Sequence, residues 1–241
     1  GTLGYAAKEM RRLVGKAIHE RSMIEHGDRV LVAVSGGKDS LSLLWLLRER
    51  IRRIPIEYEL TAVHVDPGFG ADSGSRMAAF FEEHGFAHRI VRGDFGPRAH
   101  GPENLENPCF LCSRLRRKAL FETAEALGCN KIAFGHHKDD LIETLFLNLF
   151  YGGSISTMVP VQRFFDGRIT AIRPLYRVEE KVVARFAREM GWPEIDLGCP
   201  TAGNSKRNEI KEMLARFYRS NPKIKGNIFH ALQNVRKDYL P

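Results

Sequence analysis

The chain has 241 residues, of which 43% are hydrophobic, enough to bury a sizeable core in one large domain or in one domain with appendages. Four cysteines are too few for a disulfide scaffold, and no apolar run approaches the roughly 18 residues of a membrane span, so we expect a cytoplasmic protein with no membrane partner. The net charge of +8 is uneven, because residues 204–241 carry nine Lys or Arg against three acidic residues, and this pattern indicates either a polyanionic partner or solvated helix faces.

Strands and helices alternate along most of the chain. An N-terminal helix is expected at 4–25, and the apolar run 30–34, which ends at glycines, predicts a buried strand. Glycine stops, capping residues and apolar periodicity then predict helices at 39–51, 74–85, 113–128 and 139–153, with strands at 58–66, 87–93, 131–137 and 168–175. Further helices are expected at 178–191, 204–221 and 222–237.

This order predicts an α/β fold with an open parallel five-stranded sheet and helices on both faces. An N-terminal helical segment (1–27), a nucleotide-binding domain (28–177) and a basic C-terminal helical segment (178–241) are expected to form one compact unit. The glycine-rich segments 66–75 and 93–104 are expected to be loops that follow strands, at the sheet edge where open α/β proteins bind ligands.

The eight residues AVSGGKDS, 33–40, follow the first strand and open a helix. Gly36 and Gly37 allow a close approach of the backbone to a ligand, and the N–H groups of the next helix attract an anion. Lys38 adds a positive charge, and Asp39 is expected either to hold Mg²⁺ or to cap the helix. The segment is not a GxxxxGK[ST] loop, but it predicts a phosphate site, with Ser35 and Ser40 as hydroxyl donors.

Two cysteines, Cys109 and Cys112, stand three residues apart at the start of a helix that Pro108 opens. A CxxC pair is a redox pair, half of a zinc site, part of an iron–sulfur site, or two buried small residues. Cys199, in a Gly/Pro loop, is the candidate for a third ligand, whereas Cys129 is expected in the core. Arg116, one turn after Cys112, is the cation of this helix that we expect to face inward.

A cluster of histidines and acids follows the fourth strand. His136, His137, Asp139, Asp140 and Glu143 have a spacing that permits shared helix faces, so a metal site and ordinary capping both remain open. At the N-terminus of a helix, Asp139 or Asp140 is a candidate cap, magnesium ligand or active-site acid.

Three motifs carry a resemblance to a known family. SGGKDS resembles the pyrophosphate loop of the PP-loop ATPase superfamily, and FGHHKDDLIETLFLNLFYGG resembles the GHxxDDxxET block of its tRNA-modifying branch. PCFLCSRLRR resembles the cysteine segment of the tRNA 2-thiocytidine synthetases, the TtcA family. The similarity runs from about Glu25 to Cys199, with one departure: Cys199 lacks the second cysteine of the pair expected there.

The resemblance implies ATP-dependent thiolation of tRNA, with ATP cleaved between its α and β phosphates and the O2 of an anticodon-loop cytidine adenylated and then replaced by sulfur. It implies ATP, Mg²⁺ and a 4Fe-4S cluster as cofactors, tRNA and a sulfur donor (cysteine desulfurase or sulfide) as partners, and a homodimer. The residues expected to act are Lys38, Asp39, Asp139, Asp140 and Arg116 in catalysis; Ser35, Gly36, Gly37, Lys38, Asp39, Ser40, His64 and Gly135 in nucleotide binding; and Cys109, Cys112 and Cys199 as cluster ligands.

Two alternatives stay open at this point. A PP-loop enzyme with another acceptor would make thiouridine, lysidine or a small-molecule amide, and lysidine or amide formation needs no cluster. A nucleic-acid-binding protein with a regulatory ATP site belongs to a different class and would release no AMP or pyrophosphate.

Overall fold

The computed structural model describes residues 4–70, 72–193, 195–201, 203 and 205–239. They divide into two compact units, one made of residues 1–137 and 159–200 and the other of residues 138–158 and 201–241. The expected domain limits at 27/28 and 177/178 stay a prediction. Within the described part of the chain, no helix combines the length and apolar character needed to cross a membrane.

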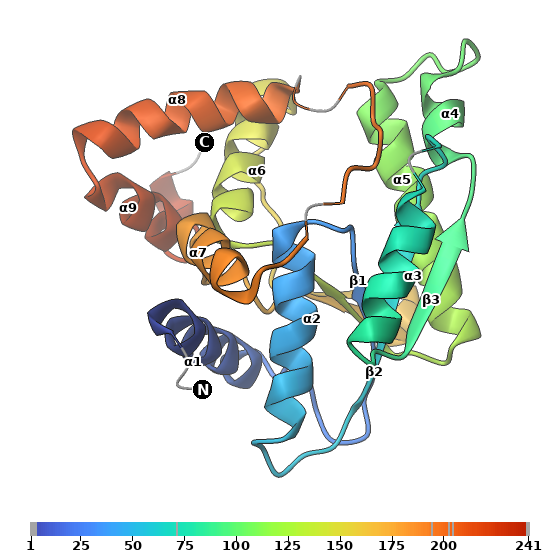
Figure 1. Cartoon of the computed structure of the whole chain (residues 1–241). Coiled ribbons are helices and arrows are strands. Elements are labelled where there is room, and N and C mark those ends of the chain that lie inside the picture. Colours follow the sequence, from blue (N-terminus) through green and yellow to red (C-terminus); the bar gives the residue numbers. More distant parts are fainter. Residues whose placement is uncertain (1–3, 71, 194, 202, 204, 240–241) are drawn as a thin grey trace. The chain divides into compact units, whose positions relative to one another are not determined.

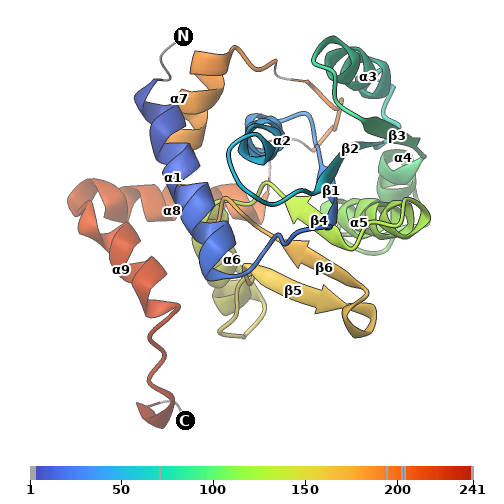
Figure 2. The same ribbon diagram turned by 90° about the horizontal axis from the view of Figure 1, so that it is seen from below.

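The first unit is built on a six-stranded sheet with the strand order β3-β2-β1-β4-β6-β5. Figure 1 labels β1, β2 and β3 near α2 and α3, and Figure 2 also labels β4, β5 and β6. Five strands are parallel: β1 (Arg29–Ala33), β2 (Glu59–Asp66), β3 (His88–Arg92), β4 (Lys131–Phe134) and β6 (Ile169–Ile172). These correspond to the five strands expected from the sequence. The expected number is nevertheless wrong, because β5 (Val161–Phe164) adds an antiparallel edge strand.

The extra strand arises from a tight hairpin. Phe165, Asp166 and Gly167 take φ values of 53°, 56° and 89° and return the chain directly from β5 into β6. Four residues bounded by a proline and this turn give too short a pattern to predict a strand.

Helices cover both faces of the sheet, as Figure 2 shows for α2 and α5. On the α5 face, the core includes Leu31, Val63 and Ile132 from the sheet and Leu120 from the helix. The helices of this unit are α1 (Tyr5–Glu20), α2 (Lys38–Ile51), α3 (Ser73–Glu83), α4 (Phe95–His100), α5 (Pro108–Ala126) and α7 (Glu180–Met190).

Several limits differ from those expected. The N-terminal helix ends at Glu20 and not at Glu25, since Ser22 has φ of 45°. The helix expected at 113–128 begins at Pro108, so that Cys109 and Cys112 lie within it. The last expected helix, 222–237, ends at Ala231. The segment 93–104, expected to be a loop, contains the short helix α4.

The second unit contains α6 (Lys138–Tyr151), α8 (Lys206–Ser220) and α9 (Lys223–Ala231). Its core is formed by Ile142, Ile210 and Leu214, against which residues of α9 such as Phe229 pack. The helix after the GHH segment therefore shares a core with the basic C-terminal helices.

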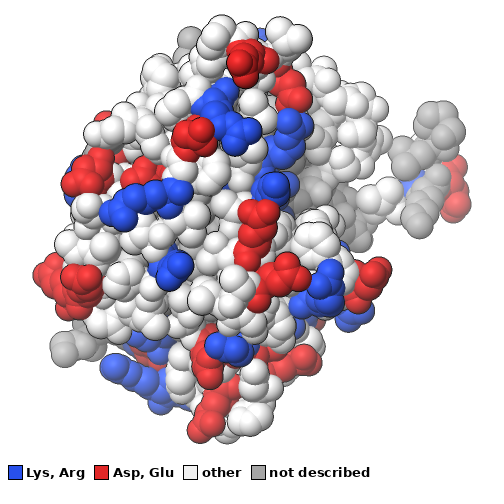
Figure 3. All heavy atoms as spheres, turned by 90° about the vertical axis from the view of Figure 1, so that its right-hand side faces the viewer, with Lys and Arg blue, Asp and Glu red and all other residues white. Residues whose placement is uncertain are grey.

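Charge on the α3–α4–α5 side of the first unit is mixed. Figure 3 shows Lys and Arg interspersed with Asp and Glu on this face, with no broad area of one sign. The positive excess of the chain is therefore not concentrated on this face.

Candidate active site

The nucleotide loop connects β1 to α2 in the turn that the sequence predicts. Gly36 has φ of +91°, a conformation that favours glycine, and a Cβ on it would lie 3.1 Å from the Cβ of Ile195. The Ser40 hydroxyl donates to the Gly37 carbonyl oxygen at 2.9 Å and accepts from the Ser35 N–H at 3.1 Å. These bonds hold the loop at the N-terminus of a fourteen-residue helix, where N–H groups attract phosphate.

Lys38 stands in the first turn of α2 between two carboxylates. Its Nζ lies 3.3 Å from Asp39 Oδ2 and 3.3 Å from Glu180 Oε1. Burial alone would lower the pKa of Lys38, but the two carboxylates outweigh it and raise the pKa, so the side chain is a fixed cation. Glu180 is the first residue of α7 and belongs to no recognisable motif, so its contact with Lys38 could not be predicted.

Two further predicted nucleotide-site residues support this loop. His64 is fully buried, with Nδ1 2.8 Å from the Val34 carbonyl oxygen and Nε2 3.2 Å from Ser73 Oγ, and burial lowers its pKa. A Cβ on Gly135 would lie 3.0 Å from the backbone nitrogen of Ser40, so only glycine fits there without displacing α2. Both residues hold the loop in place, while direct contact with a nucleotide remains a prediction.

The predicted acids of α6 are paired with cations from the C-terminal helices. Lys225 Nζ lies 2.5 Å from Asp139 Oδ1, and Arg207 Nη1 lies 3.1 Å from both Asp140 Oδ1 and Glu143 Oε2. Burial raises the pKa of Glu143, with Asp140 adding to this and Arg207 opposing it. The second unit thus keeps these acids close to electrical neutrality.

His137 belongs to the same sequence block but to the first unit. It is buried, and its Nε2 lies 3.8 Å from Asp39 Oδ1. The GHHKDD block therefore contributes Gly135 and His137 beside the start of α2, and its two aspartates to the core of the second unit.

Three cysteines meet in the first unit. Asn107 caps α5 by accepting from the N–H groups of Cys109 and Phe110, and Pro108 occupies the first turn, as expected. Burial raises the pKa of Cys112, Arg116 opposes this shift, and the thiols of Cys199 and Cys109 add to it. Cys109 and Cys199 therefore both lie within electrostatic range of Cys112.

Arg116 faces these thiols. Burial lowers its pKa, while Cys112, Cys199 and Asp66 act in the opposite direction, and its buried Nε has no hydrogen-bond partner within the described part of the chain. Cys129 lies in the core at the other end of α5 and is 5% exposed. The structure thus separates Cys129 from the other three cysteines as the sequence predicts.

Comparison with known proteins decides the family. Residues 6–215 match the family described as PP-loop domain. The chain is 43% identical over 238 residues to the tRNA-cytidine(32) 2-sulfurtransferase of Syntrophotalea carbinolica, a match that covers 97% of this chain and 91% of that protein. A relative of the same name in Geobacter sulfurreducens is 39% identical over 236 residues, covering 97% and 92%.

The chain belongs to the tRNA-cytidine(32) 2-sulfurtransferase family. Among solved structures, it is similar to the U34-tRNA thiolase NcsA from Methanococcus maripaludis with its 4Fe-4S cluster, with a TM-score of 0.79 and 25% identity over 98% of this chain and 80% of that one. The NH3-dependent NAD synthetase of Campylobacter jejuni, at 14% identity and a TM-score of 0.54 over 99% of this chain and 98% of that one, shares the fold.

The described residues do not form a site for a single metal ion. Among the residues that the structure describes, no three His, Cys, Asp or Glu side chains come close enough together to enclose one ion. Zinc would require its sulfurs at about 2.3 Å from a common centre.

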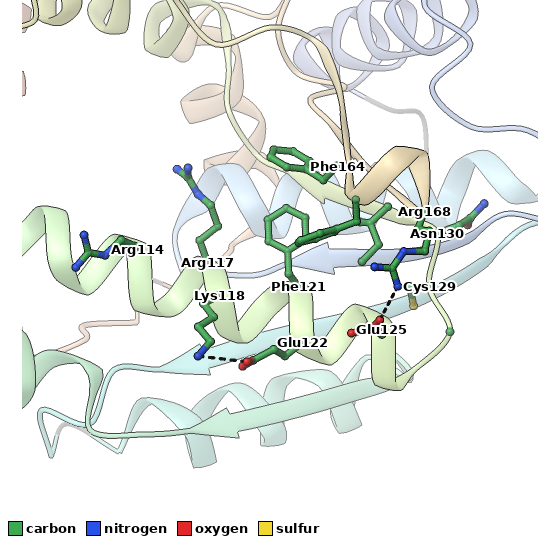
Figure 4. Close-up of a pocket in the computed structure, with 13 residues that line it drawn as sticks. Arg114, Arg117, Lys118, Phe121, Glu122, Glu125, Cys129, Asn130, Phe164 and Arg168 are labelled. Carbon is green, nitrogen blue, oxygen red and sulfur yellow. Dashed lines mark hydrogen bonds and ion pairs between the residues drawn. The ribbon is translucent and has the colours of Figure 1, made fainter.

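A separate apolar pocket of about 720 Å³ lies between α5 and the β5–β6 hairpin (Figure 4). Phe121, Phe164 and Phe165 line it, and their rings lie 4.8 to 6.3 Å apart. None of the predicted site residues is among its lining residues, although Arg117 and Cys129 are.

Proposed function

We propose that the protein thiolates a cytidine of tRNA at the expense of ATP. The observation that carries the proposal is that one unit holds the nucleotide loop together with Cys112, the thiols of Cys109 and Cys199 that affect its pKa, and the buried Arg116. An adenylating loop alone would serve many acceptors, and the thiols with their buried arginine narrow the chemistry to sulfur transfer.

The nucleotide loop binds and orients ATP. The N-terminus of α2 and Lys38 attract the β and γ phosphates, and Asp39 and Glu180 keep Lys38 charged and limit its movement. The cytidine O2 attacks the α phosphorus, the bond to the bridging oxygen breaks, and pyrophosphate leaves. Asp39 would hold Mg²⁺, which would neutralise charge on the phosphates.

Sulfur then replaces the activated oxygen. Sulfide adds at C2 of the base, the C2–O bond breaks, and AMP leaves with that oxygen. Cys109, Cys112 and Cys199 would hold a 4Fe-4S cluster, which would supply the sulfur for this replacement. Arg116 stabilises negative charge on the thiolates and on the departing phosphate. Asp139 and Asp140 stay proposed active-site acids.

Partners follow from the same chemistry. We propose that exposed cations of the N- and C-terminal helices contact the tRNA backbone and that sulfide or a cysteine desulfurase provides the sulfur. A dimer and a cytoplasmic location also stay proposals. An exposed loop base is the proposed target, because an unstacked base can be reached by a protein.

The test uses protein purified without oxygen and incubated with ATP, Mg²⁺, sulfide and unmodified tRNA. Mass spectrometry of the digested tRNA is expected to find 2-thiocytidine. The reaction mixture is expected to contain AMP and pyrophosphate in equal amounts. Lys38→Ala should lower the rate about 10²–10³-fold, and Lys181→Ala, which removes an exposed ammonium of α7, should leave it unchanged. Thiouridine in place of 2-thiocytidine would show that the modified base is a uridine. The absence of AMP would refute adenylation.

A further inference from the structure

An unusual buried cation that is not among the predicted site residues lies just after β6. Arg173 is 7% exposed, and its Nη1 donates to the Val159 carbonyl oxygen at 2.5 Å. Its guanidinium carbon lies 5.9 Å from the Phe134 ring centre. Its Nε is buried without a hydrogen-bond partner. Among the residues that the structure describes, no carboxylate pairs with the Arg173 guanidinium.

A buried guanidinium without a carboxylate is costly, and a second arginine makes it more so. Burial, together with the charge of Arg117 on α5, lowers the pKa of Arg173 to about 10. A leucine or methionine would fill the same space without this cost. The position therefore calls for an anion, for which Nε and the remaining guanidinium N–H groups provide donors.

Arg173 is close to the nucleotide loop through a short chain of contacts. Phe134, which it faces, ends β4 and stacks on His136 with ring centres 5.6 Å apart. Gly135 lies between these two residues and abuts the backbone of Ser40. The cation thus lies beside the segment that touches the first turn of α2.

Arg117 connects the same place to the cysteines. It follows Arg116, and successive residues of a helix point about 100° apart. The thiols of Cys112 and Cys199 raise the pKa of Arg116, whereas the charge of Arg117 lowers the pKa of Arg173. Figure 4 shows Arg117 pointing away from Lys118, which pairs with Glu122 on the other side of α5.

We propose that Arg173 and Arg117 form a phosphate subsite that binds a backbone phosphate of the tRNA next to the nucleotide to be modified. This deepens the proposed function and rests on it for the identity of the RNA. ATP is the less suitable occupant, since its phosphates are provided for at the α2 N-terminus and Lys38, two strands away in the order β1-β4-β6. Arg117 is exposed, so a chain running over the surface can reach the pair. A phosphate between the two guanidinium groups would also remove their repulsion.

The experiment measures tRNA affinity over a range of KCl concentrations for Arg173→Met, Arg117→Gln and the matched control Lys118→Gln. Each arginine variant is expected to bind tRNA about 10-fold more weakly at low salt, with the slope of log K against log[salt] shallower by about 0.7–0.9, the value of one phosphate contact. Lys118→Gln should match the wild type. Arg173→Lys should keep the slope and lose part of the affinity, because it keeps the charge without the fork.

ATP affinity and the visible absorbance of the cluster provide the counter-test. Both should stay at the wild-type value in Arg117→Gln and Arg173→Met. Unchanged tRNA affinity and slope in Arg117→Gln would overturn the subsite, and this exposed variant decides the matter if Arg173→Met does not fold. A loss of ATP affinity without a loss of tRNA affinity would also overturn it. Failure of the proposed function gives another pattern: wild-type protein that binds tRNA yet releases no AMP.

Discussion

We expect the ion pair between Lys225 and Asp139 to stabilise the packing of α9 against α6. The two side chains are 17% and 11% exposed, and Nζ and Oδ1 lie 2.5 Å apart. Lys225 also lies 4.8 Å from the Tyr218 ring centre. Lys225→Met keeps most of the volume but leaves a buried carboxylate without this cation.

The expected loss follows from burial. Breaking one side of a fully buried pair costs about 3–5 kcal/mol, and the residual exposure reduces this to about 2–3 kcal/mol. In a protein of this size, that lowers the melting temperature by about 5–10 °C. Lys223→Met is the matched control, because Lys223 lies on the same helix two residues earlier and is exposed.

Thermal unfolding followed by circular dichroism gives the global value, and hydrogen exchange of peptides from α6 and α9 localises it. Faster exchange in both helices is expected for Lys225→Met alone. The double variant with Asp139→Asn should lose less than the sum of the two single changes, since the interaction is counted once. Equal shifts for Lys225→Met and Lys223→Met would refute the reasoning.

Three further outcomes are expected from the first unit. Cys112→Ser or Cys199→Ser should remove the visible absorbance of the cluster and reduce bound iron, whereas Cys129→Ala, in the core, should keep about four iron atoms per chain; iron loss in Cys129→Ala would exclude the proposed ligand set. Gly135→Ala should weaken ATP binding at least 10-fold by calorimetry, because its Cβ would lie 3.0 Å from the Ser40 nitrogen; wild-type affinity would show that α2 can move aside. Burial lowers the pKa of His64, so the unfolded state takes up its proton first and stability should fall as pH drops below about 6.5; urea unfolding at several pH values should show a smaller fall in His64→Gln, and parallel curves would contradict this.

Local signals predicted the parallel part of the fold and the nucleotide loop. The apolar run before Gly36 has the length of a buried strand, and Lys38 opens a helix, so both elements follow from neighbouring residues. Strand β5 could not be predicted because its four residues are stabilised by pairing with β6 and not by their own pattern. The spacing of Cys109 and Cys112 is visible in the sequence, whereas the electrostatic effect of Cys199 on Cys112 depends on the fold.

Burial of charge was the property hardest to predict. Arg173 follows an apolar strand and precedes a proline, a place where a charged residue is normally exposed, yet the structure buries it. Glu180 looks like an ordinary acid of a first helical turn, but it contacts Lys38 across 142 positions of sequence. In each case the deciding neighbour is distant along the chain, and no local pattern encodes it.

The charge of the C-terminal segment illustrates the same point and limits the RNA surface. Its nine cations suggested a broad phosphate-binding face, but Lys206 pairs with Glu209, Arg207 with Asp140 and Glu143, and Lys225 with Asp139. A cation that neutralises a protein carboxylate releases no counterion from RNA. The segment therefore contributes fewer phosphate contacts than its composition implies, and the salt dependence of tRNA binding should be shallower than nine contacts would give. Cations outside this segment, Arg117 and Arg173 among them, must then carry part of the binding.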